Sequence, residues 1–164
     1  MLSIRIQDIL TADADILVLS ANPSLLAGSG ISGVIHKAAG PKLEAAAKPF
    51  APIEPGQSII TPAFNLPAKY IIHTVCPRYM DGQRGENEQL YKSYASALAF
   101  HDRTPEAKSI AVASMGTGVY KWPPHLAAAI AIDALTKSKF ELTLMCILDS
   151  VLLETYTQIR CELH

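Results

Sequence analysis

The sequence predicts an α/β fold: a three-layer α/β/α sandwich with a central mixed, mostly parallel six-stranded sheet and helices on both faces. Two observations predict it. Six short, apolar, largely β-branched runs alternate along the chain with segments that have the apolar periodicity of helices. In addition, the succession of strand, glycine-bearing loop and helix occurs twice, and such units build sheets whose strands run parallel.

Length and composition indicate one globular domain covering residues 1–164. Hydrophobic residues make up 49% of the chain, charged residues 18%, and the formal net charge is -1. This balance gives no electrostatic reason to expect nucleic acid or a membrane as a partner. No apolar run is long enough to span a bilayer, and the N-terminus lacks an apolar signal core. Three widely spaced cysteines favour reduced thiols and a cytoplasmic location.

Four elements are expected first: strands at residues 4–9 and 15–21, then helices at residues 34–39 and 41–48. The first strand alternates weakly, with Ile4 and Ile6 on one face, and Asp8 at its end is a candidate turn or cap residue. The second strand is a continuous apolar run, which is typical of a fully buried strand. Gly40 ends the first helix, and Pro41 suits the first position of the second.

The rest of the chain is expected to form strands at residues 57–61, 70–75, 109–113 and 142–148, and helices at residues 88–103, 124–137 and 151–161. Pro62 and Pro77 end the first two of these strands, because proline cannot donate to a sheet. Leu90, Tyr94 and Leu98 recur at helical spacing in the first of these helices.

A glycine-rich loop joins the strand at residues 15–21 to the helix that follows. It contains Gly28, Gly30 and Gly33. A helix start offers N–H groups without partners and a partial positive charge, and glycines let an anion approach the backbone. We therefore expect this loop to bind a phosphate group. The alternative, which these residues alone leave open, is a tight turn with close helix–strand packing.

A second glycine-bearing loop follows the strand at residues 109–113 and contains Gly116 and Gly118. In parallel sheets, ligands bind beyond the carboxyl ends of the strands, and both loops lie at such ends. Two anion-binding loops that meet in one crevice would suit a diphosphate better than a single phosphate.

Other chemistries are weakly supported. The run from Gly28 to Gly33 matches G-x-G-x-x-G, but six residues separate it from the strand, and the next acidic candidate, Glu54, lies in a proline-rich linker. An NAD(P)-dependent oxidoreductase therefore remains a weak third possibility. The histidines share no metal-ligand spacing with the cysteines, so no metal is expected, and His36 and His73 are expected in the core. No G-x-S-x-G elbow is present.

Four segments, in the same order, resemble the macrodomains, a family that binds and processes ADP-ribose. They are Asp8-Ile9, residues 20–41 with the motif Ser-Ala-Asn-Pro and the first glycine loop, residues 59–75, and Thr117-Gly118-Val119-Tyr120 with Pro123. The resemblance covers nearly the whole chain. It implies the three-layer fold and ADP-ribose as the ligand, with no further cofactor.

The resemblance assigns a role to individual positions. Asp8 would accept a hydrogen bond from the adenine amino group, and Ile9 would donate one from its backbone nearby. Asn22 would hydrogen-bond the distal ribose hydroxyls, and Tyr120 would pack beside that ribose. The alternatives are that Asn22 is only a turn former before Pro23, and that Tyr120 is a core aromatic residue.

The two phosphates would be held by backbone N–H groups of the two glycine loops. The expected ligand contacts are Asp8, Ile9, Ala21, Asn22, Ser29, Gly30, Ile31, Ser32, Gly33, Val34, Gly116, Thr117, Gly118, Val119, Tyr120 and Leu148. Asn22 and Ser32 are the candidate catalytic residues. Partners would be ADP-ribose itself or a mono-ADP-ribosylated protein.

Several departures from the family pattern bear on activity. Ser32 stands where the hydrolytic members have an aspartate that orients or activates water, and a serine hydroxyl cannot act as a general base near neutral pH. Ser29 and Gly116 stand where a glycine and a serine are common, and Leu148 where an aromatic residue often flanks adenine. The leading hypothesis is therefore an ADP-ribose-binding module. The alternative is an ADP-ribosyl hydrolase or O-acetyl-ADP-ribose deacetylase of reduced activity.

Overall fold

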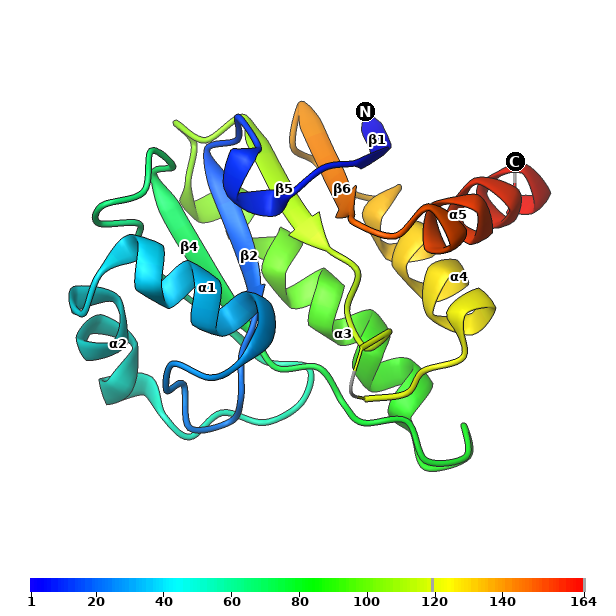
Figure 1. Ribbon diagram of the computed structural model, residues 1–164, viewed down its shortest axis with the longest axis horizontal. Coiled ribbons are helices and arrows are strands. Elements are labelled where there is room, and N and C mark those ends of the chain that lie inside the picture. The colour runs from blue at the N-terminus through cyan, green and yellow to red at the C-terminus, as the bar shows by residue number, and fades with distance from the viewer. Residues whose placement is uncertain (119, 164) are drawn as a thin grey trace.

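A computed structural model describes residues 1–118 and 120–163, and its centre is a six-stranded sheet (Figure 1). The strands are β1 (Leu2–Ile6), β2 (Ile16–Ser20), β3 (Ser58–Pro62), β4 (Tyr70–Thr74), β5 (Ser109–Ala113) and β6 (Leu142–Ile147). Their order is β1-β6-β5-β2-β4-β3. Every neighbouring pair is parallel except β3 and β4. The mixed, mostly parallel sheet predicted from the sequence is confirmed.

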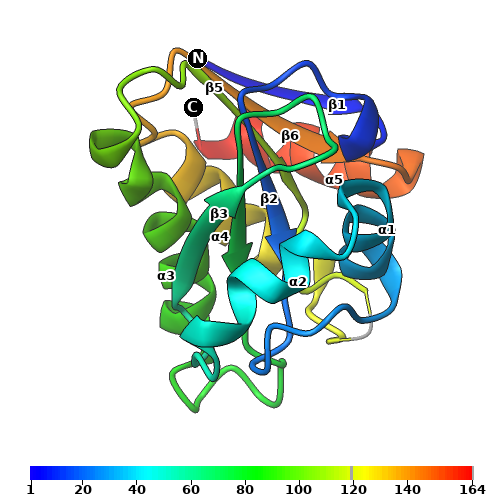
Figure 2. The same ribbon diagram turned by 90° about the vertical axis from the view of Figure 1, so that its left-hand side faces the viewer.

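In the described part of the chain, five α-helices cover the two faces of the sheet. They are α1 (Gly30–Ala39), α2 (Lys42–Ala47), α3 (Glu86–Leu98), α4 (Pro124–Leu135) and α5 (Ser150–Leu163). Short 3-10 turns follow β1, α2 and α3, at Ile9–Thr11, Lys48–Phe50 and Ala99–Arg103. Helices α1 and α2 lie on one side of the sheet, with α3 and α4 on the other (Figures 1 and 2). The three-layer sandwich is thus confirmed.

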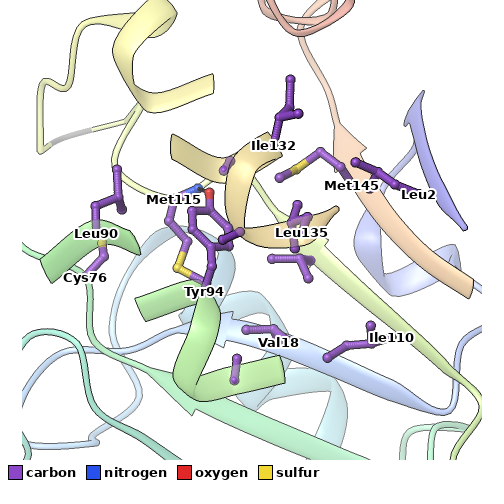
Figure 3. Packing of buried hydrophobic residues seen from close by; sticks show 14 of the residues in the cluster. Leu2, Val18, Cys76, Leu90, Tyr94, Ile110, Met115, Ile132, Leu135 and Met145 are labelled. Carbon is purple, nitrogen blue, oxygen red and sulfur yellow. Dashed lines mark hydrogen bonds between the residues drawn. The ribbon is translucent and has the colours of Figure 1, made fainter. Parts of the chain in front are cut away.

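Alternate side chains of the central strands enter two separate cores. In β2, Ile16 and Val18 pack with residues of α3, α4 and α5, whereas Leu17 and Leu19 pack with residues of α1 and α2. Figure 3 shows part of the first core, where Tyr94 of α3 lies among aliphatic side chains. Because β2 is buried on both faces, its sequence is continuously apolar instead of alternating.

Among the predicted boundaries that differ from the structure, two do so for identifiable reasons. The strand expected at residues 4–9 is β1, which ends at Ile6, because Asp8 caps the 3-10 turn by accepting a hydrogen bond from the Leu10 N–H at 3.0 Å. The helix expected from Val34 is α1, which already begins at Gly30. Glycine disfavours helix interiors, so the pattern alone places the start too late.

The carboxyl ends of the parallel strands share one edge of the sheet. The loops that follow β2, β4 and β5 leave this edge together, toward the bottom of Figure 1. None of the helices in the described part of the chain has the length and apolar character required to cross a bilayer.

Candidate ligand-binding site

The ends of β2, β4 and β5 are joined directly beneath the two glycine loops. The Ala21 N–H donates to the Thr74 carbonyl at 2.8 Å, and Ser20 Oγ lies 3.5 Å from Cys76 Sγ. Burial raises the pKa of the Cys76 thiol, and hydrogen bonds from Ser20 and the Gly116 backbone partly oppose that shift. Cys76 is therefore a packed, protonated thiol between the two loops, and the loops lie over neighbouring strands.

The first glycine loop ends at the N-terminus of α1, whose first amides are available. In the described structure Ser29 occupies the N-cap position but its side chain makes no capping hydrogen bond. Because α1 begins at Gly30, the N–H groups from Ser29 to Ser32 have no acceptor within the helix. The Gly33 and Val34 N–H groups lie further in, where the helix supplies its own acceptors, and their contact with a phosphate stays a prediction. Four adjacent amides and the positive end of a helix dipole are features that attract an anion.

In the first turn of α1, Ser32 is buried and Gly33 is half-buried against the preceding loop. A Cβ atom on Gly33 would lie 2.2 Å from the Gly28 carbonyl oxygen, so only glycine allows this helix to pack so closely on its own loop. Ser32 is 6% exposed, and its hydroxyl has no hydrogen-bond partner within the described residues. A buried hydroxyl without a partner is unusual in folded proteins and is typical of functional sites.

Asn22 organises the loop between β2 and α1. Its Nδ2 donates to the Leu26 carbonyl at 3.0 Å, and its Oδ1 accepts from the Leu26 N–H at 3.2 Å and from Ser24 Oγ at 2.6 Å. The side chain therefore acts as the turn former that one interpretation of the sequence foresaw. An amide nitrogen carries two protons, so the second Nδ2 proton remains for a ligand.

Glu44 of α2 fixes the same loop from the side. Its Oε1 accepts a hydrogen bond from the Ala27 N–H at 2.9 Å. The carboxylate also acts on the neighbouring His36, whose pKa is lowered by burial and raised in part by the charge of Glu44. His36 and His73 are both buried, as expected for core residues. No role was predicted for Glu44 from the sequence, because the contact joins α2 to a loop residue 17 positions earlier in the chain.

The second glycine loop is anchored by buried aromatic residues. Tyr94 Oη accepts the Met115 N–H at 2.8 Å, and Trp122 Nε1 donates to the Pro77 carbonyl at 2.9 Å. The Trp122 N–H donates to the Gly116 carbonyl at 3.1 Å and closes the loop. Gly116 has a φ of +85°, and a Cβ atom there would lie 2.4 Å from Trp122 Cδ1. The tryptophan ring thus explains why glycine stands where a serine is common in the family.

The loop after β4 supports the second glycine loop. The Tyr79 N–H donates to the Tyr120 carbonyl at 3.2 Å, and the Tyr79 ring packs against Trp122 at 5.1 Å between centroids. In the same loop, the Arg78 guanidinium carbon lies 5.6 Å from the centre of the half-buried Tyr120 ring. The loops after β4 and β5 therefore form one packed unit beside the first glycine loop.

Glu86 at the start of α3 holds the loop after β4 in shape. Burial would raise its pKa, but backbone N–H groups of the loop outweigh that effect and lower the pKa to about 2. The donors include Met80 at 2.7 Å and Arg84 at 2.8 Å. Neither Glu86 nor Trp122 was assigned a role from the sequence; the one available signal was that the single tryptophan follows the glycine loop.

Asp8 and Leu148 lie at the ends of the neighbouring strands β1 and β6. The Gln7 N–H donates to the Ile147 carbonyl at 3.0 Å, so the residues that follow on each chain segment are neighbours. The Asp8 side chain is exposed, and Ile9 beside it is buried. Leu148 is 69% exposed, and Ile6 and Val151 are exposed as well. The exposed Asp8 carboxylate thus lies beside exposed apolar side chains where β1 and β6 end.

The structure brings the predicted residues to one edge of the sheet, with two qualifications. Val119 lies outside the described residues. In addition, a concavity of about 270 Å³ lies elsewhere, between α3 and α4, and its lining includes Tyr91, His101 and Lys137. This concavity does not coincide with the site expected at the strand ends. Within residues 1–118 and 120–163, no group of three or more His, Cys, Asp or Glu side chains could hold a metal ion.

Comparison with known proteins extends these observations. Residues 18–131 match the family model of the macro domain. The O-acetyl-ADP-ribose deacetylase of Klebsiella pneumoniae is 42% identical over 133 residues, which cover 79% of this chain and 75% of that protein.

Two solved structures show the same arrangement of elements. The Oceanobacillus iheyensis macrodomain with ADP matches with a TM-score of 0.91 and 32% identity, covering 99% of this chain and 90% of that one. The Trypanosoma brucei macrodomain in complex with ADP-ribose matches with a TM-score of 0.83 and 27% identity, covering 98% of this chain and 68% of that one. The chain belongs to the macro domain family.

Proposed function

We propose that this protein binds ADP-ribose, free or as a terminal ADP-ribosyl group on proteins, through the backbone amides of its two glycine loops. The observation that carries the proposal is the uncapped start of α1 beside the loop after β5, above neighbouring strands. A diphosphate needs rigid N–H donors from two sides, and these loops are well suited to supply them. The complexes of related macrodomains with ADP and ADP-ribose support the same ligand.

The order of residues along the sheet edge supports one orientation of the ligand. Asp8 and Leu148, at the ends of β1 and β6, would receive adenine, with the carboxylate accepting from its amino group. The two loops after β5 and β2 would hold the diphosphate. Asn22 and Tyr120 would contact the distal ribose, Asn22 through its remaining amide proton. Because an exposed leucine replaces a stacking aromatic, we expect the adenine contact to be weaker than in relatives with an aromatic residue there.

The proposal is tested by a calorimetric titration of the protein with ADP-ribose. We expect a dissociation constant in the micromolar range, on the order of -8 kcal/mol. Competition with NAD separates this function from that of an oxidoreductase, which would prefer NAD to ADP-ribose. A titration without saturation would refute ADP-ribose binding, and a preference for NAD would refute the assigned ligand class.

A second candidate function is hydrolysis of ADP-ribosyl or O-acetyl-ADP-ribose bonds. It is favoured by the identity to the Klebsiella pneumoniae deacetylase. In such a reaction water attacks the ester or glycosidic bond, and a base must accept its proton. Ser32 cannot do so near neutral pH, and we therefore propose reduced activity.

Replacing Ser32 with aspartate tests this second function. The position lies in the first turn of α1, where the helix dipole favours a carboxylate. We expect turnover of O-acetyl-ADP-ribose or of a mono-ADP-ribosylated protein to rise at least about tenfold in Ser32→Asp. Ser32→Asn is the matched control, because asparagine has the shape of aspartate but lacks its basic carboxylate oxygen. Equal turnover in wild type and Ser32→Asp would show that the missing base does not limit the reaction.

A further inference from the structure

Two cationic residues flank Tyr120 on the outside of the site. The Arg78 guanidinium carbon lies 5.6 Å from the centre of the Tyr120 ring, on the loop after β4. Lys121 directly follows Tyr120 and is exposed. We call Arg78 and Lys121 the cationic rim. Both belong to the packed unit that the Tyr79 N–H bond to the Tyr120 carbonyl holds together.

The backbone of Lys121 occupies a conformation that a lysine rarely adopts. Its φ is +60°, in the left-handed region that favours glycine. A glycine there would relieve the strain, so the fold alone gives no reason for a lysine. Strained non-glycine residues gather at functional sites, and this residue is a cation that directly follows Tyr120 in the chain.

The charges of the rim are not neutralised within the described residues. Arg84, Lys108 and Lys139 each lie within 4 Å of a carboxylate, whereas neither Arg78 nor Lys121 does so in residues 1–118 and 120–163. The nearby carboxylates are engaged elsewhere: Asp81 pairs with Arg84 at 3.3 Å, and Glu86 accepts backbone N–H groups. The cation–π contact with Tyr120 places the Arg78 guanidinium beside that ring, and a planar guanidinium suits a carboxylate.

We propose that the cationic rim binds an acidic polypeptide segment that flanks the ADP-ribosylated residue of a target protein. The proposal rests on the proposed function, because Tyr120 then lies beside the distal ribose. The modified protein is attached through that ribose, so its chain leaves the site past Tyr120. Aspartate or glutamate side chains near the modified residue would then meet Arg78 and Lys121, and the rim would select targets by the charge around the modification.

The test compares two synthetic peptides that carry ADP-ribose through a hydrolysis-resistant triazole bond. They are identical except that the flanking residues are aspartate and glutamate in one, and asparagine and glutamine in the other. At low ionic strength, wild-type protein should bind the acidic peptide about three- to tenfold more tightly, and added salt should reduce this advantage. Free ADP-ribose is titrated in parallel as the measure of the site itself.

Variants then assign the preference to the rim. In the double variant Arg78→Gln with Lys121→Gln, the ratio of the two dissociation constants should fall close to one. The control Lys108→Gln removes the same kind of charge at the amino end of β5, on the opposite edge of the sheet, and should keep the ratio. Arg78→Lys keeps the charge without the planar guanidinium and should retain only part of the preference for the acidic peptide.

The outcomes separate the inference from the proposed function. Equal affinity of wild type for both peptides, together with saturable binding of ADP-ribose, would overturn the rim and leave the proposed function standing. A preference that persists in the folded double variant would also overturn it. Absence of binding by free ADP-ribose and by both peptides would refute the proposed function and the inference together.

Discussion

Replacing Gly116 with alanine should destabilise the protein by about 2–5 kcal/mol. Two penalties add. The φ of +85° places the new side chain in the left-handed region, which costs about 1–2 kcal/mol for a residue with a Cβ atom. The new Cβ would also lie 2.4 Å from Trp122 Cδ1, and forcing an atom into a packed region costs about 1–3 kcal/mol.

The Trp122 ring has little freedom to move away. It is 2% exposed, its Nε1 donates to the Pro77 carbonyl at 2.9 Å, and Tyr79 packs on it. Moving the ring would therefore disturb the loops after β4 and β5 together. We expect weaker ADP-ribose binding in Gly116→Ala as well as lower stability.

Thermal unfolding followed by circular dichroism measures the effect. For a chain of this length, the expected loss lowers the melting temperature on the order of 10 °C. Gly118→Ala is the matched control, because its φ is not in the left-handed region and, apart from its two chain neighbours, no atom of the described residues lies within 4 Å of the added Cβ. A melting temperature for Gly116→Ala within about 2 °C of wild type would refute the packing described for this loop.

Two further predictions concern stability. Lys121→Gly should stabilise the protein by about 0.5–1 kcal/mol, because the relief of strain at a φ of +60° exceeds the cost of the added entropy of the unfolded chain. Urea unfolding measures the effect, and the control Lys121→Gln should show no gain in stability. Burial, and then the charge of His36, lower the pKa of His73 from 6.5 to about 3. As the pH falls below 6.5, His73 takes up a proton in the unfolded chain but not in the folded one. The free energy of unfolding should therefore decrease by up to about 1.4 kcal/mol for each pH unit, until the pH reaches about 3. His73→Asn should flatten this dependence of the unfolding free energy on pH, whereas the control His125→Asn, at an exposed position, should not. An unchanged dependence in His73→Asn would contradict its assignment to His73.

The strands could be predicted well because each is short, apolar and bounded by residues that break it. The β4 run from Tyr70 to Thr74 is β-prone and is followed closely by Pro77, and the structure has the strand there. The start of α1 could not be found in the same way. Gly33 looks like a loop residue in the sequence, but it is helical because the helix packs on the Gly28 carbonyl, a contact that only the folded chain reveals.

The candidate site was predictable only where its residues follow a local pattern. The glycine loops are such patterns, and the structure brings both to one edge of the sheet. The residues that fix their shape are distant in sequence: Trp122 reaches Pro77 across 45 positions, and Glu44 reaches Ala27 across 17. No periodicity or propensity encodes such contacts, because each depends on how separate elements pack.

The most direct test of the account is an amide chemical-shift titration of isotopically labelled protein with ADP-ribose. If the backbone of both loops binds the diphosphate, the largest shifts belong to the amides of Ser29 to Ser32 and of Gly116 to Gly118. Saturable shifts confined to one loop would contradict a shared diphosphate site. Shifts centred on Tyr91 and Lys137, at the concavity between α3 and α4, would place the ligand elsewhere and refute the site.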